Sequence, residues 1–269
     1  MQTMRRHWPE YLIEAACLGI FMVSACAFTT LLGHPDSPVE HAVRSDLARR
    51  MLMGIAMGGT AISLIYSPWG MRSGAHMNPA VTLTFWRLGK VSAPDALFYA
   101  GAQAAGGVLG VLVASALLGP RIADPAVRYA VTVPGRLGPV PAFAAEVVIS
   151  CILMSLILAV TNTPRIARFT GLCAGALVAT WITIEAPISG MSMNPARSLA
   201  SALPSGIWTA FWIYLLAPPL GMLAAAEIRT RLLRQEHVLC AKLHHDNDQR
   251  CIFADCRYPM RTPAAIQTA

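Results

Sequence analysis

The chain has 269 residues, of which 55% are hydrophobic and only 13% are charged, and its net charge is +7. Soluble domains carry about 25% charged residues, so this composition excludes most soluble enzymes, and its hydrophobicity excludes a disordered chain. The excess of Lys and Arg fits the cytoplasmic loops of a membrane protein better than it fits a nucleic-acid partner. The seven cysteines are an odd number without a secreted spacing pattern, which argues against a disulfide scaffold.

Six segments are long and apolar enough to span a membrane, which takes about 20 mostly apolar residues as helix. The first of them follows Arg5 and Arg6 as in a signal peptide, but Glu14 inside it and five further spans favour an uncleaved helix. The six predicted spans are 11–32, 50–68, 96–118, 141–161, 170–188 and 208–228.

Two shorter apolar segments, 79–88 and 195–203, each cover about 15 Å as helix, which is half a bilayer. Both begin with Asn-Pro-Ala, and Asn at the cap with Pro at the first helical position is typical of a helix start. Duplicated short segments at corresponding places in two halves indicate a channel or transporter site. The two motifs are Asn78, Pro79, Ala80 and Asn194, Pro195, Ala196.

The duplication extends to an acidic residue in the first span of each half, Glu14 and Glu146. Each half therefore holds three spans and one half-helix, and because three is odd, the second half must enter the membrane inverted. The predicted organisation is an N-terminal segment 1–10, a first channel repeat 11–118, a connecting outer loop 119–140, a second channel repeat 141–228 and a basic tail 229–269.

Lys and Arg are distributed unequally between the two sides of the predicted spans. With the N-terminus inside, 14 of them lie on the cytoplasmic side and 7 outside, although the tail supplies half of the inner count. Cytoplasmic loops collect basic residues, so the sequence predicts that both termini are cytoplasmic.

This pattern resembles the major intrinsic protein family, the aquaporins and aquaglyceroporins. The resemblance runs from about Glu14 to Glu227 and rests on the paired motifs, on Arg197 after the second motif and on the acid in each half. It implies an all-α membrane protein of six transmembrane helices and two re-entrant half-helices in an inverted repeat, with the half-helices meeting at mid-membrane. It also implies a homotetramer in the lipid bilayer of a plasma or inner membrane, conducting water and small uncharged solutes passively while excluding protons and ions.

The motif has a physical rationale at the centre of the pore. Two half-helices that meet by their N-termini aim two partial positive charges at one point, which repels protons and cations. Asn78 and Asn194 cap their helices and present N–H donors to a passing water molecule. The simpler alternative is that each Asn is only a helix cap.

The resemblance further implies a four-residue constriction, which spacing from the motifs places at Gly58, Ile182, Met191 and Arg197. Gly58 lacks the aromatic bulk that narrows water-selective members, Ile182 lacks a hydrogen-bonding group, and the flexible Met191 refills part of the gap. These residues favour larger neutral solutes, such as glycerol, urea or undissociated metalloid acids, as an alternative to water.

Residues flanking the second motif point back towards the water-selective branch. Ser198, Ala202 and the pair Phe211 and Trp212 resemble aquaporins rather than glycerol channels. The sequence therefore leaves both selectivities open.

Four further polar residues lie in or beside the predicted spans. The resemblance implies that Glu14 and Glu146 accept hydrogen bonds from the backbone of the re-entrant loops, whose irregular peptide groups need partners. Glu185 is expected at the outer mouth, paired with Arg197 or with a loop arginine. His76 is expected at the inner mouth as a packed polar residue, with a protonation switch as the alternative.

Three Cys and two His within seventeen residues of the tail are of metal-ligand type, and reduced cytosolic thiols are available to zinc. A structural zinc site is one expectation; a disordered basic tail, or a segment that docks on anionic lipid through Arg229, Arg231 and Arg234, is the alternative. The candidate ligands are Cys240, His244, His245, Cys251 and Cys256.

The sequence contains no phosphate-binding glycine loop and no nucleophile–base pattern, so we expect neither an enzyme nor a required cofactor. A secondary transporter built on inverted repeats is a further alternative, but its coupling-ion site would need more pore acids than the chain offers. A membrane scaffold whose tail binds a metal or a partner is another.

Overall fold

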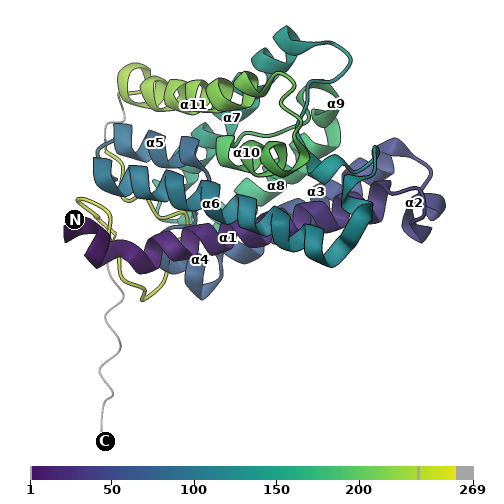
Figure 1. Ribbon diagram of the computed structural model, residues 1–269. Helices are drawn as coiled ribbons and strands as arrows, with labels where there is room; N and C mark the ends of the chain where they lie inside the picture. Colours follow the sequence, from purple (N-terminus) through teal and green to yellow (C-terminus); the bar gives the residue numbers. More distant parts are fainter. Residues whose placement is uncertain (1, 235–236, 259–269) are drawn as a thin grey trace, which may run out of the picture.

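The computed structural model describes residues 2–234 and 237–258, and over this part of the chain it is built from helices without strands (Figure 1). Each half repeats one order of elements: two long helices, a very short helix, a half-length helix and a third long helix. The first half comprises α1 (Gln2–Gly33), α3 (Asp46–Ile65), α4 (Pro68–Ser73), α5 (Pro79–Arg87) and α6 (Ala93–Leu118), with α2 (Pro38–Ala42) in a loop. The second half comprises α7 (Pro139–Thr161), α8 (Thr170–Ile184), α9 (Ala186–Ser189), α10 (Pro195–Ser205) and α11 (Phe211–Glu227).

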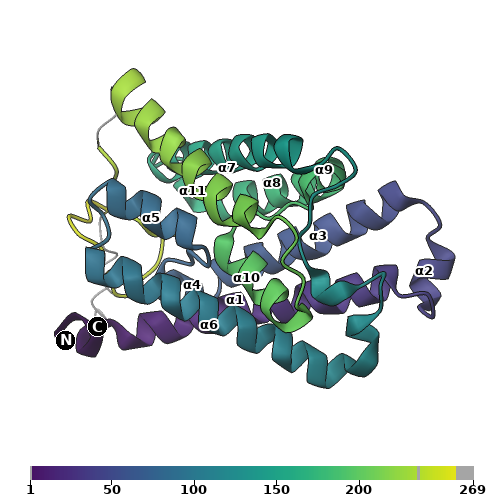
Figure 2. The same cartoon turned by 45° about the horizontal axis from the view of Figure 1, so that its top comes forward.

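Five of the described helices are long and apolar enough to cross a membrane, by length and composition: Arg5–Gly33, Ala93–Ala123, Pro139–Thr161, Ala167–Ile184 and Phe211–Leu232. The sixth predicted span, 50–68, is not among them. Its helix α3 ends at Ile65 and begins at Asp46, so that Arg49 and Arg50 lie in its first turns and lower its hydropathy. α3 still packs along α8 inside the helix bundle (Figure 2).

Small residues let the helices approach closely in three pairs: α1 with α6, α7 with α11, and α3 with α8. A Cβ atom on Gly106 would lie 2.1 Å from the carbonyl oxygen of Ala15, and one on Gly221 would lie 2.2 Å from that of Val147. The first two pairs join the first and third long helices of each half. The third pair joins the second long helices of both halves, so the bundle has the two-fold arrangement of an inverted repeat.

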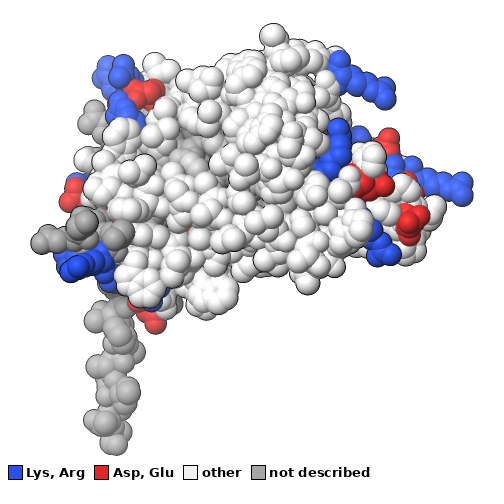
Figure 3. Space-filling view, viewed as in Figure 1, with Lys and Arg blue, Asp and Glu red and all other residues white. Residues whose placement is uncertain are grey.

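Charged side chains gather at the two ends of the molecule, and the surface between the ends is almost free of them on the face shown in Figure 3. Large apolar side chains are exposed on this middle part, including Leu109 on α6, Leu220 on α11 and Val148 on α7. An exposed apolar belt between two charged rims is the surface that a bilayer covers.

The predicted tail, 229–269, begins as a continuation of α11, a turn of π-helix over Ile228–Leu232. Residues 237–258 then run as irregular chain at the end of the bundle where the N-terminus of α1 lies (Figure 1). Residues 235–236 and 259–269 of this tail lie outside the described residues. We call the end of the bundle beneath this segment the tail side.

Candidate functional site

The two half-helices meet by their N-termini in the middle of the bundle, where Asn78 caps α5 and Asn194 caps α10. Each side-chain oxygen accepts from its own helix, Asn78 Oδ1 from the N–H of Ala80 at 2.9 Å and Asn194 Oδ1 from that of Ala196 at 3.1 Å. Each side-chain nitrogen donates to the other half.

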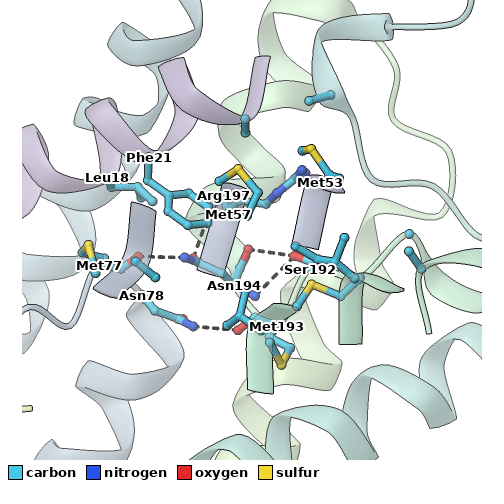
Figure 4. Close-up of a pocket in the computed structure, with 18 of the residues that line it drawn as sticks. Leu18, Phe21, Met53, Met57, Met77, Asn78, Ser192, Met193, Asn194 and Arg197 are labelled. Atoms are coloured by element: carbon cyan, nitrogen blue, oxygen red, sulfur yellow. Dashed lines mark hydrogen bonds between the residues drawn. The ribbon is translucent and has the colours of Figure 1, made fainter. Parts of the chain in front are cut away.

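These crossed bonds run from Asn78 Nδ2 to the carbonyl of Met193 at 2.6 Å and from Asn194 Nδ2 to the carbonyl of Met77 at 2.7 Å (Figure 4). An amide nitrogen carries two N–H donors, so each Asn keeps a second donor for a molecule in the pore. The Asn side chains are therefore helix caps and fixed pore donors at the same time.

The chain reaches each Asn through a loop with alternating left-handed residues. Ala75 and Met77 have φ of 55° and 48°, and Met191 and Met193 have φ of 51° and 53°. A non-glycine residue in this region costs about 1 kcal/mol, so the surroundings must hold the loops in place. The geometry turns successive backbone N–H groups towards one point in each half.

A buried carboxylate occupies that point in each half. Glu14 accepts from the N–H of His76 at 3.1 Å and of Met77 at 2.6 Å, and also from the Ser73 hydroxyl at 2.7 Å and Gln103 Nε2 at 2.7 Å. A carboxylate that takes several hydrogen bonds from otherwise unpaired peptide groups stabilises irregular backbone inside a membrane.

Glu146 repeats this arrangement in the second half. It accepts from the N–H of Ser192 at 2.6 Å and of Met193 at 2.8 Å and from the Ser189 hydroxyl at 2.8 Å. Both predicted acids thus lie against the loops that the resemblance assigned to them.

A cavity of about 350 Å³ passes the two Asn residues. It extends from the loop residues 126–128 and Arg50 at one end to Ile65, His76 and Leu243 at the tail side. Methionines form much of its wall, and they are Met53, Met57, Met77, Met191 and Met193. The wall is therefore flexible and apolar, with a few polar groups at fixed places.

Three of the four predicted constriction residues, Ile182, Met191 and Arg197, line this cavity. Gly58 does not: a Cβ atom there would lie 2.5 Å from the carbonyl oxygen of Gly175, so Gly58 lies in the contact between α3 and α8. Its neighbour Met57 faces the cavity instead, next to Arg197 in Figure 4. Successive side chains along a helix point about 100° apart. An error of one residue in the spacing counted back from Asn78 therefore moves the predicted pore residue from the face of α3 that lines the cavity to the face that packs on α8.

Arg197 reaches the cavity from the first turn of α10. Its Nη1 atom is buried and has no hydrogen-bond partner within the described structure. A buried, unpaired guanidinium donor that lines a cavity is a group prepared to bind a polar molecule from that cavity.

The structure contradicts the expectation that Glu185 forms an ion pair at the mouth. Glu185 is 5% exposed, does not line the cavity, and neither carboxylate oxygen has a hydrogen-bond partner in the described part of the chain. It follows α8 directly, one residue beyond the apolar helix Ala167–Ile184, whereas the predicted span 170–188 included it, and burial raises its pKa to about 7. Its N–H still donates to the carbonyl of Trp181 at 2.8 Å, so Glu185 continues the last turn of α8, and its side chain is buried outside the cavity.

His76 is a packed residue at the tail-side mouth. Its Nδ1 atom lies 3.0 Å from Thr82 Oγ1, and its ring stacks on Phe85 and on Phe253, with centroids 5.2 Å and 5.4 Å away. Its Nε2 atom lies 2.9 Å from the carbonyl oxygen of Ala241 and so donates to the tail.

The sequence reasoning missed Met53 and Met57 in the pore wall and the tail residue Leu243, which also lines the cavity. The methionines were detectable, because Arg50, Met53, Met57, Ala61 and Ile65 recur at helical spacing on one face of α3. No sequence pattern could have shown that Leu243 lines the cavity, because irregular chain has no periodicity that marks a buried face.

Four of the five candidate metal ligands in the tail come together. The ligand atoms of Cys240, His245, Cys251 and Cys256 all lie within 4.8 Å of one another. The fifth candidate, His244, lies outside this cluster, because its ring packs edge-on against Tyr66 at 4.8 Å.

Comparison with known proteins matches the whole membrane part of the chain. A family model described as Major intrinsic protein matches residues 3–228. Aquaporin NIP2-3 of Zea mays is 33% identical over 228 residues, which cover 84% of this chain and 73% of the relative. Aquaporin NIP6-1 of Arabidopsis thaliana is 35% identical over 188 residues, which cover 70% of this chain and 60% of the relative.

Among solved structures, the X-ray structure of the aquaglyceroporin from Plasmodium falciparum matches with a TM-score of 0.68 at 20% identity, covering 84% of this chain and 97% of that chain. This similarity confirms the predicted all-α architecture of membrane helices and re-entrant half-helices. The match to the family model ends before the tail.

Proposed function

The chain belongs to the major intrinsic protein family and is a passive channel for water and small solutes, and from this premise we propose that its pore admits neutral solutes larger than water while excluding protons and ions. The observation that carries the proposal is the cavity past Asn78 and Asn194, whose lining combines the guanidinium of Arg197 with several methionine and isoleucine side chains.

Exclusion of cations rests on the charges at the centre of the pore. The N-termini of α5 and α10 meet there, each with a partial positive charge, and the guanidinium of Arg197 adds a full one. The two Asn donors also orient a passing water as an acceptor, which interrupts a chain of hydrogen bonds that could carry a proton.

Passage of larger solutes rests on the apolar part of the cavity wall. Met57, Ile182 and Met191 offer no hydrogen-bonding side chain, and two of the three are flexible thioethers. A polyol presents a hydroxyl face and a hydrocarbon face, so it matches a pore with donors on one side and apolar carbon on the other. Water gains nothing from the apolar side.

We also propose the cellular setting: a cell membrane with both termini in the cytoplasm, a tetramer of identical pores, and no enzymatic activity. The orientation rests on the 14 of 21 basic residues that this arrangement places inside. The exposed apolar belt is the surface available to lipid and to neighbouring chains.

Stopped-flow light scattering of proteoliposomes tests the permeability. Under a sucrose gradient we expect faster shrinkage than in empty liposomes, and under a glycerol gradient we expect shrinkage followed by re-swelling. A pH-sensitive dye inside the vesicles should report no proton flux.

Because Leu243 of the tail lines the cavity, the assay includes Phe253→Ala, which loosens the tail, beside the wild type. Shrinkage without re-swelling in both proteins contradicts the wider solute range. No acceleration in either one contradicts conduction.

A further inference from the structure

The tail covers the mouth of the cavity on its own side. Ala241 accepts a hydrogen bond from His76, and the N–H of Leu243 donates to the carbonyl of Gly74 at 3.1 Å, so residues 241–243 follow the first re-entrant loop. Leu243 lines the tail-side end of the cavity, and the Phe253 ring stacks on that of His76, with centroids 5.4 Å apart.

Further hydrogen bonds fix the tail around this mouth to both halves of the protein. In the second half, Asn162 Oδ1 accepts from the N–H of Leu239 at 2.6 Å, and the Tyr258 hydroxyl donates to the carbonyl of Thr161 at 2.6 Å. In the first half, Lys90 accepts from the N–H of Ala254 at 2.9 Å, and its Nζ donates to the carbonyl of Asp255 at 3.0 Å. These bonds hold the tail over the mouth of the cavity, and we call residues 237–258 the cap.

The cap has almost no regular structure of its own, since residues 237–258 form neither helix nor strand. Nevertheless Cys240, Ala241 and Lys242 are at most 1% exposed. A segment this short cannot build a sufficient hydrophobic core, and small units of this kind are held by disulfides or by a metal.

The cysteines are free thiols, with Cys240 Sγ and Cys251 Sγ 3.5 Å apart, beyond the S–S bond length of about 2.05 Å. His245 Nε2 lies 3.0 Å from Cys256 Sγ. In a tetrahedral zinc site with Zn–S distances of about 2.3 Å, ligand atoms are about 3.3–3.8 Å apart. All four ligand atoms lie within 4.8 Å of one another, so a modest adjustment brings them to that geometry.

Neighbouring residues complete the environment of such a site. His245 is oriented by stacking on Tyr258, with ring centroids 4.7 Å apart and planes inclined by 12°. Three thiolates on one Zn²⁺ leave a net negative charge, and the same segment holds the buried ammonium of Lys242, which donates to the carbonyl of Gln249 at 2.8 Å. The donor set of three soft sulfurs and one imidazole is typical of structural zinc.

We propose that Cys240, His245, Cys251 and Cys256 bind one Zn²⁺, and that the zinc-held cap narrows the tail side of the pore, so that the zinc-loaded protein conducts less than the protein without zinc. Loss of zinc loosens residues 237–258, because the metal joins four points of an irregular chain that is otherwise joined across its centre by single contacts, such as the hydrogen bonds from the N–H of Arg257 to the carbonyl of Leu239 at 3.0 Å and from Lys242 Nζ to the carbonyl of Gln249 at 2.8 Å. The metal thereby controls permeability. This closure rests on the proposed conduction, whereas the zinc site itself does not.

Elemental analysis of the purified full-length protein tests the site. We expect about one zinc per chain, loss of zinc in Cys251→Ser/Cys256→Ser and in His245→Ala, and full retention in the matched control His244→Ala. Co²⁺ exchanged into the protein should give the visible absorption of a tetrahedral thiolate complex. A wild type without zinc, or with a Cys240–Cys251 disulfide in mass spectrometry under reducing-buffer purification, overturns the site.

Proteoliposome permeability, with a membrane-permeant zinc chelator, tests the closure. We expect a several-fold rise in solute permeability when the wild type is chelated, the same high level in His245→Ala without chelator, and no response to chelator in that variant. His244→Ala should behave as wild type. Phe253→Ala should keep its zinc and show a higher permeability than the wild type. This result would distinguish the effect of the position of the cap from the effect of zinc binding itself.

The outcomes distinguish the two proposals. Equal permeability of the zinc-loaded and chelated wild type, both above empty liposomes, overturns the closure and leaves conduction standing. Absence of conduction in the wild type, the chelated protein and the tail variants contradicts the proposed function and the closure together, while zinc content still decides the site.

Discussion

At the scale of single residues, the pore wall depends on which side chain of α3 faces Arg197. Spacing from the first motif predicted Gly58, whereas Met57 lines the cavity. Met57→Ala should therefore raise glycerol permeability severalfold, because it removes a flexible side chain from the wall, and Met57→Phe should lower it while water still passes. Re-swelling rates in proteoliposomes measure both, and the exposed Met51→Ala on the same helix is the control; equal rates in all four proteins would contradict the role of Met57.

The buried acids Glu146 and Glu185 should respond to the same substitution in opposite directions. In Glu146→Gln the amide cannot accept all three of the hydrogen bonds that the carboxylate accepts, and its NH₂ faces donors. An unsatisfied buried N–H costs about 1–3 kcal/mol, so Glu146→Gln should unfold at a lower temperature in detergent.

Glu185→Gln should instead stabilise the protein at alkaline pH. Burial raises the pKa of Glu185 from 4.5 to about 7, so the folded protein holds this proton more tightly than the unfolded chain, and stability falls as pH rises from 4.5 towards 7. The gain from Glu185→Gln should be largest at pH 8 and absent at pH 4. Thermal unfolding across this range checks the sign, and a variant less stable than wild type at pH 8 would contradict it.

At the scale of elements, glycines set the distances between helices. Gly58 on α3 lies against Gly175 on α8, and Gly59 has open space around its Cβ position. Gly58→Ala should cost about 1–3 kcal/mol through overpacking, which a lower unfolding temperature and a broadened gel-filtration peak would show. Gly59→Ala is the matched control and should be neutral or stabilising in a helix. Were Gly58 a pore residue, its substitution would reduce permeability at unchanged stability.

The elements also show how far the sequence alone leads. The half-helices 79–88 and 195–203 were predictable to within two residues, since Asn-Pro-Ala is both a helix start and a duplicated motif; their structural bounds are Pro79–Arg87 and Pro195–Ser205. Counting residues back from Asn78 did not identify the side chain of α3 that faces the pore, although the helical spacing of Arg50, Met53 and Met57 marks that face. The burial of Glu185 was not predictable either, because it depends on how segments distant in sequence pack against the end of α8.

At the scale of the whole molecule, the architecture followed from the sequence and the tail did not. Apolar spans and a duplicated motif fix an inverted repeat through physical rules that are local in sequence. The position of the tail depends on long-range hydrogen bonds such as the one from Tyr258 to Thr161, and no sequence pattern predicts such bonds. Only the residue types of Cys240, His245, Cys251 and Cys256 pointed to a cluster.

We expect that the two halves can be made as separate chains but form a pore only together. The crossed hydrogen bonds of Asn78 and Asn194 and the packing of α3 on α8 join them. We expect segments 1–138 and 139–269 to conduct when they are co-expressed and reconstituted together, and neither to conduct alone. Permeability in vesicles that hold a single segment would contradict this.

The same crossed bonds impose an order on biosynthesis. The amide of Asn78 and the carbonyl of Met77 find their partners on residues 193 and 194, so the first loop stays incomplete until the chain of 269 residues has been made as far as these positions. Until the second motif inserts, two strongly polar groups of the first half need water or the translocation machinery as a temporary partner. The centre of the pore is therefore completed long after the first half has been made, and a ribosome that stalls before residue 194 leaves the first half without these partners.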